Sequence, residues 1–324
     1  MRRYLKLLVS AALIAIAIYL LDVQAIINMI KSGSAVSFVV AGMLNILTFF
    51  VIGVRWYILI TPAVRLSVTA HIAIYLKGTF LNTFTPANLG GDAYRLAVLR
   101  KKGGADGGLV KLLLRERIIG LYGYVIVFVL AYIFVSFYTD IDAPLAGNPY
   151  TYGVILALGL FLLPFVARRL GGGLAALVRG IIGKERLPRL EIWAEAVASL
   201  LSFKGVLPLM LLTFCGILLW VVSIKVIGEG FGVSIPLMHL AAAATLVEII
   251  RLVPVTIQGI GLREGAFAYL LSFLGHSPEQ CYVVGTVAYL ALSVAIILCG
   301  PLGYAIMRRE QGGVRAMRTE ERIE

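Results

Sequence analysis

Two charged stretches inside otherwise apolar sequence are the candidates for chemistry in this chain. One reads NTFTPANLGGDAYRLAVLRKKGG (residues 82–104) and the other reads VPVTIQGIGLREGAFAYLL (residues 253–271). In each, proline and closely spaced glycines precede a basic and an acidic residue within one helical turn. These charged residues are Asp92, Arg95, Arg263 and Glu264. Helix N-termini attract anions and guanidinium groups bind phosphate through paired hydrogen bonds, so the pattern predicts binding of a phosphate-bearing anion.

The composition places these stretches in a membrane protein. The chain has 324 residues, of which 60% are hydrophobic and 14% are charged, and its mean hydropathy is +0.95. Soluble domains carry about 25% charged residues. Several apolar runs also reach the ~20 residues that a helix needs to cross hydrocarbon. We therefore expect an all-α polytopic membrane protein that resides in the lipid bilayer.

Apolar runs and their interruptions predict about six transmembrane helices and two re-entrant helical hairpins. The full-length runs lie at about residues 5–21, 38–60, 118–138, 152–170, 205–227 and 281–306. Residues 67–103 and 236–275 are apolar but are cut by proline and glycine, and their second arms are too short or too charged to span. Residues 1–21 also resemble a signal peptide, but no small-residue cleavage site follows directly, so we expect a retained first span.

The distribution of basic residues predicts the orientation. Lys and Arg are enriched in the cytoplasmic loops of membrane proteins. If residues 67–85 crossed the membrane completely, the basic cluster that follows them would lie on the outer side. With re-entrant hairpins, most of the 29 Lys and Arg, and both termini, are cytoplasmic. The short loops and the lack of a glycosylation acceptor favour a multi-pass protein of a prokaryotic cytoplasmic (inner) membrane.

The order of spans and hairpins predicts an inverted repeat within a single integral membrane domain, residues 1–324. Residues 1–150 and 151–310 would each contain two spans, a hairpin and a further span, and residues 311–324 would form a cytoplasmic tail. Interrupted segments at matching positions of inverted halves are typical of the substrate site of a transporter, near the bilayer midplane.

The two hairpin tips form the predicted anion site. Glycines at the tips would present backbone N–H donors to the ligand, and these are Gly90, Gly91, Gly259 and Gly261. The two arginines beside them would hold phosphate. The neighbouring carboxylates would cap their helices and compete with phosphate for the arginines. Alternatively the charged groups form only internal ion pairs, Arg95 with Asp92, and Arg263 with Glu264 or Glu248.

Other polar residues near the tips are secondary candidates. Three amide side chains would satisfy the tip backbone or hydrogen-bond a headgroup, namely Asn82, Asn88 and Gln258. Arg115 and Glu116, in LLLRERIIG, would anchor a span at the interface, or would close the inner mouth by pairing near Asp92. Glu248 and Arg251, three residues apart, are expected to form a structural ion pair near the C-terminus of a helix.

Several classes of function lack support in the sequence. The three cysteines lie in or beside apolar runs and are expected to be small buried hydrophobes. His71, His239 and His276 are too scattered to predict a metal site, and no cofactor is expected. The net charge of +12 follows from the cytoplasmic loops, so no nucleic acid is expected as a partner. No set of nucleophile, base and orienting residue is found, and we expect a transporter rather than an enzyme.

The motifs TPANLGGDAYRLAVLRKKG, LLLRERIIGL and VPVTIQGIGLREGAFAYLL closely resemble the lysylphosphatidylglycerol synthase transmembrane-region family, also known as flippase-like domain proteins. The resemblance covers roughly residues 5–306. In that family the domain occurs fused to a cytosolic aminoacyl transferase, and it is thought to move aminoacylated phosphatidylglycerol between leaflets. Relatives are associated with hopanoid or polyprenyl-glycolipid pathways. The sequence stops at Glu324, so we expect no transferase domain and no lipid aminoacylation; the resemblance implies lipid translocation.

Three hypotheses about function follow. The first is a lipid translocase, a flippase or scramblase without its own ATPase, which moves an anionic phosphate-headgroup lipid between leaflets through a site at the two hairpin tips. The second is a secondary transporter of a small soluble anion. The third is a membrane enzyme, or an accessory subunit that works with a lipid-modifying transferase in glycolipid or polyprenyl-lipid synthesis.

Overall fold

The structure, a computed structural model, describes residues 23–83, 85, 89–104, 106–138, 148–169, 205–252, 259 and 261–320. Every regular element within these residues is an α-helix, which confirms the all-α class expected from composition. The predicted first span at residues 5–21 lies outside the described residues, as do Asn88 and Gln258.

Long apolar helices match most of the predicted spans. In the described part of the chain, four helices are long and apolar enough to cross a membrane: α3 (Ala35–Ile60), α6 (Asp106–Tyr138), α10 (Val206–Gly230) and α13 (Pro278–Glu320). A fifth, α7 (Pro149–Arg169), coincides with the predicted span at 152–170. A short helix, α2 (Val23–Ser32), precedes α3 and was not predicted. The hydroxyl of Ser34 then caps α3 by accepting a hydrogen bond from the Ser37 N–H.

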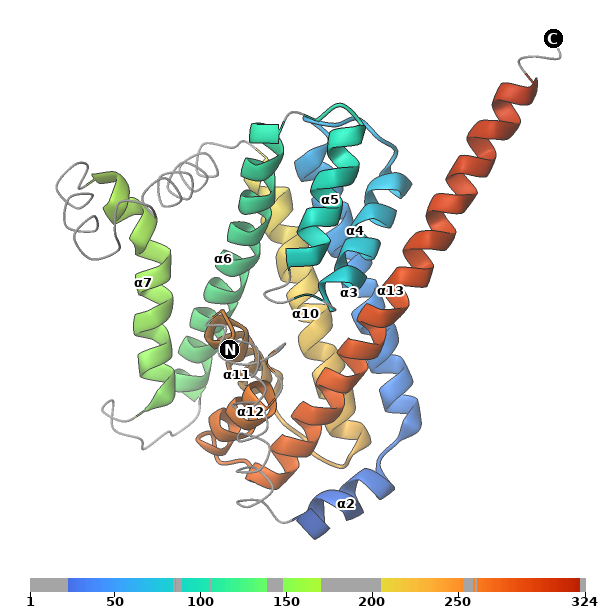
Figure 1. Ribbon diagram of the computed structural model, residues 1–324. Helices are drawn as coiled ribbons and strands as arrows, with labels where there is room; N and C mark the ends of the chain where they lie inside the picture. Colours follow the sequence, from blue (N-terminus) through green and yellow to red (C-terminus); the bar gives the residue numbers. More distant parts are fainter. Residues whose placement is uncertain are drawn as a thin grey trace, which may run out of the picture.

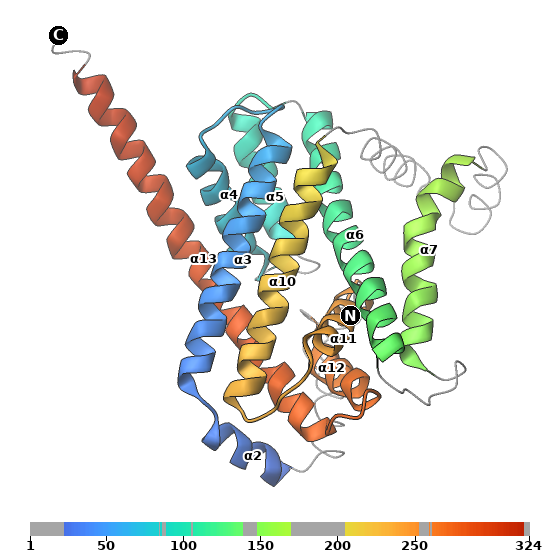
Figure 2. The same cartoon turned by 180° about the vertical axis from the view of Figure 1, so that it is seen from behind.

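Both interrupted segments are broken helices, as their prolines and glycines predict. The first consists of α4 (Val68–Asn82) and α5 (Leu89–Lys101), and the second of α11 (Leu237–Ile250) and α12 (Leu262–Ser272). In Figure 1, α4 and α5 lie in the upper half of the bundle, whereas α11 and α12 lie in its lower half; the reverse view in Figure 2 agrees. The two broken helices therefore occupy opposite ends of the molecule.

Helix α6 begins earlier than predicted, and this changes the setting of its charged residues. It starts at Asp106 rather than near residue 118. Its first turns are held by Leu109 and Leu113, which pack in a buried cluster with Trp56 of α3 and Leu99 of α5. The sequence RER at 115–117 therefore lies inside a packed helix, and not at the start of a span.

Helix α13 is longer than predicted. It continues beyond residue 306 to Glu320, and Figure 1 shows its C-terminal part projecting away from the bundle. Near the point where it leaves the bundle, Glu310 accepts hydrogen bonds from the hydroxyls of Ser67 and Thr69 at the start of α4. These contacts fix the upper end of α4 against α13.

The outer surface of the bundle is apolar, as expected for helices that face lipid. Large side chains such as Val36 and Met43 of α3, Phe137 of α6 and Leu207 of α10 are each at least 65% exposed. Polar and charged groups are buried between the helices instead, among them Asn45 and Thr245. Lipid-facing apolar side chains combined with buried polar groups are the arrangement that hydrocarbon demands.

Close packing of α4 on α5 requires a glycine at position 91. A Cβ at Gly91 would fall on the carbonyl oxygen of Gly78 and beside Oδ1 of Asn82, well inside van der Waals contact. At the other broken helix the glycines have a different role, because Gly259 and Gly261 adopt φ values of +82° and +80°. Of the four tip glycines, these two have left-handed backbone angles, whereas Gly90 and Gly91 do not.

We predict that Gly91→Ala destabilises the protein by about 1–3 kcal/mol, because the added methyl group overpacks the contact between α4 and α5. Thermal unfolding in detergent measures the effect. Gly42→Ala in α3 is the control, since a Cβ there meets nothing within 4 Å. Equal melting temperatures for the two variants would contradict the close packing.

Candidate functional site

The first candidate site is a buried cluster in which two arginines share one glutamate. Arg55 of α3 lies with Nη2 3.3 Å from Oε1 of Glu116, and Arg95 of α5 lies with Nη1 3.4 Å from the other carboxylate oxygen. All three residues are buried: Arg55 is 5% exposed, Arg95 is 3% exposed and Glu116 is 7% exposed. Glu116 of α6 thus connects three helices through charge, and it is a buried ion-pair partner and not an anchor at the interface. Arg115, the residue before it, is half-buried.

Asp92 extends this cluster towards the surface. Its Oδ1 lies 3.6 Å from Nη1 of Arg95, which confirms the predicted ion pair within α5. Its Oδ2 accepts a hydrogen bond of 2.9 Å from Nε of Arg117, whose side chain is 46% exposed. Among the described residues, the cluster therefore joins three guanidinium groups to two carboxylates, with Arg117 at its solvent-exposed edge.

The guanidinium of Arg95 is surrounded by aromatic rings and weak acceptors. Its Cζ lies 4.3 Å from the ring centre of Tyr75 and 5.1 Å from that of Trp56. Its Nη2 donates long hydrogen bonds, both 3.4 Å, to the Tyr75 carbonyl and the Thr79 hydroxyl. Its Nε is buried without a hydrogen-bond partner, as is Nε of Arg55. Both arginines thus retain a buried donor that an anionic ligand would satisfy.

The second candidate site repeats this pattern at the second broken helix, α11–α12. Glu248 of α11 pairs with Arg251 at the end of the same helix, as predicted, and its Oε1 lies 3.7 Å from Nε of Arg263 in α12. The guanidinium of Arg263 lies over the ring of Tyr289 in α13, 5.0 Å from its centre. Oε1 of Glu248 and Nε of Arg263 are both buried without a hydrogen-bond partner.

The amide donors expected to bind an anion already have acceptors within the protein. The Gly90 and Gly91 N–H groups donate hydrogen bonds of 2.8 Å to the Thr85 hydroxyl and to Oδ1 of Asn82. At the second tip, the Gly261 N–H donates to the Glu264 carboxylate, also at 2.8 Å. Asn82 and Glu264 therefore satisfy tip backbone, one of the two roles that the sequence allowed for each. The arginines, and not these amides, are left to bind an anion.

Gly259 lets the second cluster assemble against the tip. A Cβ at this position would lie 2.9 Å from Cδ of Arg251 and 3.0 Å from Cγ of Arg263. Its carbonyl oxygen also accepts the Arg263 N–H at 2.8 Å and so starts α12. The glycine is needed for the close approach of two arginine side chains, whereas the sequence predicted a role for it as a backbone donor to the ligand.

Tyr124 of α6 lies between the two clusters. Its phenol group is within electrostatic range of Arg55 in the first cluster and of Glu248 and Arg251 in the second. Its ring packs edge-on against Trp220 of α10, with the ring centres 6.1 Å apart. Tyr124 and Arg55 were not singled out from the sequence, although a lone arginine inside the apolar run 38–60 is itself a sign of a buried functional charge.

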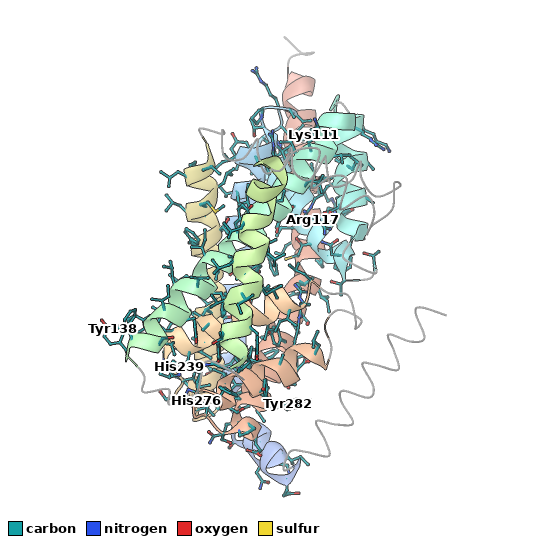
Figure 3. The ribbon with its side chains drawn as sticks, turned by 90° about the vertical axis from the view of Figure 1, so that its left-hand side faces the viewer. Lys111, Arg117, Tyr138, His239, His276 and Tyr282 are labelled. Atoms are coloured by element: carbon teal, nitrogen blue, oxygen red, sulfur yellow. The ribbon has the colours of Figure 1, made fainter. Side chains whose placement is uncertain are left out.

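Two histidines that are distant in the sequence meet at the lower end of the molecule. Nδ1 of His239 in α11 lies 3.0 Å from Nε2 of His276, which follows α12. Figure 3 shows both near Tyr282, whereas Lys111 and Arg117 lie towards the opposite end. These two histidines are therefore neighbours in space, a contact that their spacing in the sequence did not predict; no group of three or more metal-ligating side chains occurs in the described part of the chain.

The family to which the chain belongs agrees with this architecture. The family described as "Lysylphosphatidylglycerol synthase TM region" matches residues 3–300, so the chain is a member of that family and an integral membrane protein. This confirms the resemblance carried by the glycine-rich motifs. Comparison with curated proteins found no match, and neither did comparison with solved structures.

We predict that Glu116→Gln lowers the free energy of unfolding by about 3–5 kcal/mol, because it removes the carboxylate that two buried arginines share. Chemical denaturation in detergent measures this. The control is Glu229→Gln, which breaks the partly exposed pair with Lys225 (N···O 3.0 Å) and should cost about 0–1 kcal/mol. A loss for Glu116→Gln no larger than that of the control would refute the role given to Glu116.

We also predict that acid destabilises the contact between the two histidines. Burial lowers the pKa of His239 and of His276, and for His239 the neighbouring imidazole lowers the pKa further. Below about pH 6.5 the unfolded chain then binds more protons than the folded protein, so the free energy of unfolding falls as the pH decreases. Melting temperatures at pH 7.5 and 5.5 should differ more for the wild type than for His276→Gln. Equal differences would show that the pair does not titrate in this way.

Proposed function

We propose that the protein is a lipid translocase, which moves a lipid with an anionic phosphate headgroup between the leaflets. The observation that carries the proposal is the presence of two buried clusters, one at each broken helix, in which two arginines share one glutamate. Membership of a family of membrane proteins that includes flippase-like domains supports the same conclusion. Each cluster would serve as a station for the headgroup on its side of the membrane.

Unused hydrogen-bond donors favour an anionic ligand at the first cluster. The Nε donors of Arg55 and Arg95 are buried without a hydrogen-bond partner. A buried donor that lacks an acceptor is costly. A phosphate would accept both of these N–H groups. Guanidinium is suited to this role because its planar fork matches two phosphate oxygens at once.

The carboxylates form ion pairs with the arginines of each cluster in the absence of lipid. When no lipid is bound, Glu116 and Glu248 hold their arginines in ion pairs, so the cations are never left unpaired. An arriving phosphate competes with the carboxylate for the guanidinium groups. The site thus exchanges one anion for another, and this avoids the large cost of moving a bare charge out of water.

The proposal includes the membrane arrangement of the two broken helices. We infer that α4–α5 and α11–α12 are re-entrant hairpins that enter from opposite faces, the first from the cytoplasm and the second from outside. Their position at opposite ends of the bundle supports this, as does the occurrence of one cluster at each hairpin (Figure 1). Tyr124, within electrostatic range of both clusters, marks the route between them.

We predict that Arg95→Gln and Arg263→Gln each slow lipid translocation at least ten-fold in proteoliposomes, which corresponds to about 1.4 kcal/mol of lost stabilisation at the rate-limiting step. The assay follows a fluorescent phosphatidylglycerol analogue that becomes accessible to a quencher outside the vesicle. Lysine in place of either arginine should restore part of the rate, because it keeps the charge but loses the planar fork.

The control for this experiment is Arg65→Gln, which removes an exposed arginine from the connection between α3 and α4. Its rate should match that of the wild type. Wild-type rates in both Arg95→Gln and Arg263→Gln, with the proteins folded, would end the proposal. Uptake of soluble phosphate by the wild type without any lipid movement would also contradict it, and would favour a transporter of soluble anions.

A further inference from the structure

Lys77 of α4 belongs to neither arginine–glutamate cluster and lies at the side of the bundle. The stem of Lys77 crosses from α4 onto α13, where Gly303 leaves it space; a Cβ at Gly303 would lie 2.8 Å from Cγ of the lysine. The ammonium lies 5.8 Å from the ring centre of Tyr94 in α5 and 5.5 Å from that of Tyr304 in α13. Three helices therefore build a half-buried pocket of side chains around one ammonium group.

Lys77 differs from the buried arginines because no carboxylate balances it. Among the described residues, no Asp or Glu forms an ion pair with it, and its one polar contact is a weak one of 3.9 Å to Sδ of Met307. The other half-buried lysine on a long helix, Lys225, pairs with Glu229 at 3.0 Å. Aromatic faces attract an ammonium group electrostatically, but they accept none of its N–H bonds well.

The ammonium lies at a depth that suits a lipid phosphate. Glu310 bonds to Ser67 at the upper end of α4, next to the exposed Arg309. Met307 and Tyr304 are three and six residues before Glu310 on α13, which places them about 5–9 Å below this charged level at 1.5 Å per residue. Since Lys77 reaches both Met307 and Tyr304, its ammonium lies just beneath the headgroup region of a membrane that the bundle spans.

The pocket opens towards lipid and not towards the bundle interior. Tyr304 is 59% exposed, and Ile297 and Leu298, on the same helix, are 48% and 43% exposed. On the other side of α4, the next residue, Gly78, faces Arg95, because a Cβ there would meet the guanidinium. The helix therefore separates the outward-facing lysine from the inward-facing cluster.

We propose that Lys77, Tyr94 and Tyr304 form a lateral binding site for the phosphodiester of an anionic membrane lipid. The ammonium donates hydrogen bonds to the phosphate oxygens, and the exposed ring of Tyr304 covers the glycerol region of the lipid. The acyl chains lie along the apolar surface of α13. This site rests on the embedding of the bundle in a bilayer and does not depend on translocation.

Photolabelling tests the site. The full-length protein is reconstituted in nanodiscs that contain phosphatidylglycerol with a photoreactive headgroup, and the labelled peptides are identified by mass spectrometry. Labelling is expected on α13 around Tyr304 and on α4, and Lys77→Met should reduce it at least three-fold. Lys77→Arg should keep most of it. Lys225→Met is the matched control, and should leave labelling of these peptides unchanged.

A second variant and a competition experiment distinguish the possible results. Tyr304→Leu alters an exposed side chain, so it should leave the fold intact while it lowers labelling at least two-fold; this keeps the test valid if Lys77→Met does not fold. Unchanged labelling in Lys77→Met and Tyr304→Leu would overturn the proposal. Complete competition by millimolar inorganic phosphate would also overturn it, because the ligand would then be a soluble anion.

Discussion

The pairing of buried arginines with a single carboxylate is the constraint on which the described bundle depends. In lipid, apolar faces of neighbouring helices have little preference for one another, because the surrounding chains are equally apolar. Glu116 removes this ambiguity. It must meet Arg55 of α3 and Arg95 of α5, or Arg55 is left without an ion pair and Arg95 keeps only Asp92, both at less than 6% exposure. The charges therefore fix how α3, α5 and α6 are placed relative to one another, and apolar packing then fills the space around them.

The same constraint explains why the two broken helices use glycine differently. At the first, Gly91 is needed so that α5 packs closely on α4 and carries Arg95 inward. At the second, the left-handed backbone of Gly259 and Gly261 turns the chain into α12, and the missing side chain of Gly259 leaves room for two arginines. In both cases the break serves to bring an arginine from one arm to a glutamate on another helix. The tip amides are satisfied locally, so the anion-binding capacity lies with the guanidinium groups.

Much of this architecture could be predicted from the sequence because it is local. Hydropathy located the long helices, prolines and glycines located the breaks, and spacing of three residues identified the pairs of Asp92 with Arg95 and of Glu248 with Arg251. The bond between Arg55 and Glu116 joins residues 61 positions apart, and no periodicity predicts it. The capping of the tip amides and the meeting of two histidines were missed for the same reason. Such contacts depend on how helices pack, which a single sequence does not specify.

The ion-paired Arg55 and Arg95 are buried between helices, whereas Lys77, which has no ion pair among the described residues, lies at the side of the bundle. The cations that form ion pairs at depth are arginines, whose delocalised charge is weakly hydrated and suits buried pairing. The unpaired cation at the side is a lysine, whose compact ammonium on a flexible stem suits a ligand that arrives and leaves near the membrane surface. Lys77 of α4 faces outward, and its neighbour, Gly78, makes room for Arg95. The two environments are therefore separated by the width of a single helix. A phosphate held at the side would therefore lie next to the buried cluster, with α4 as the barrier between them.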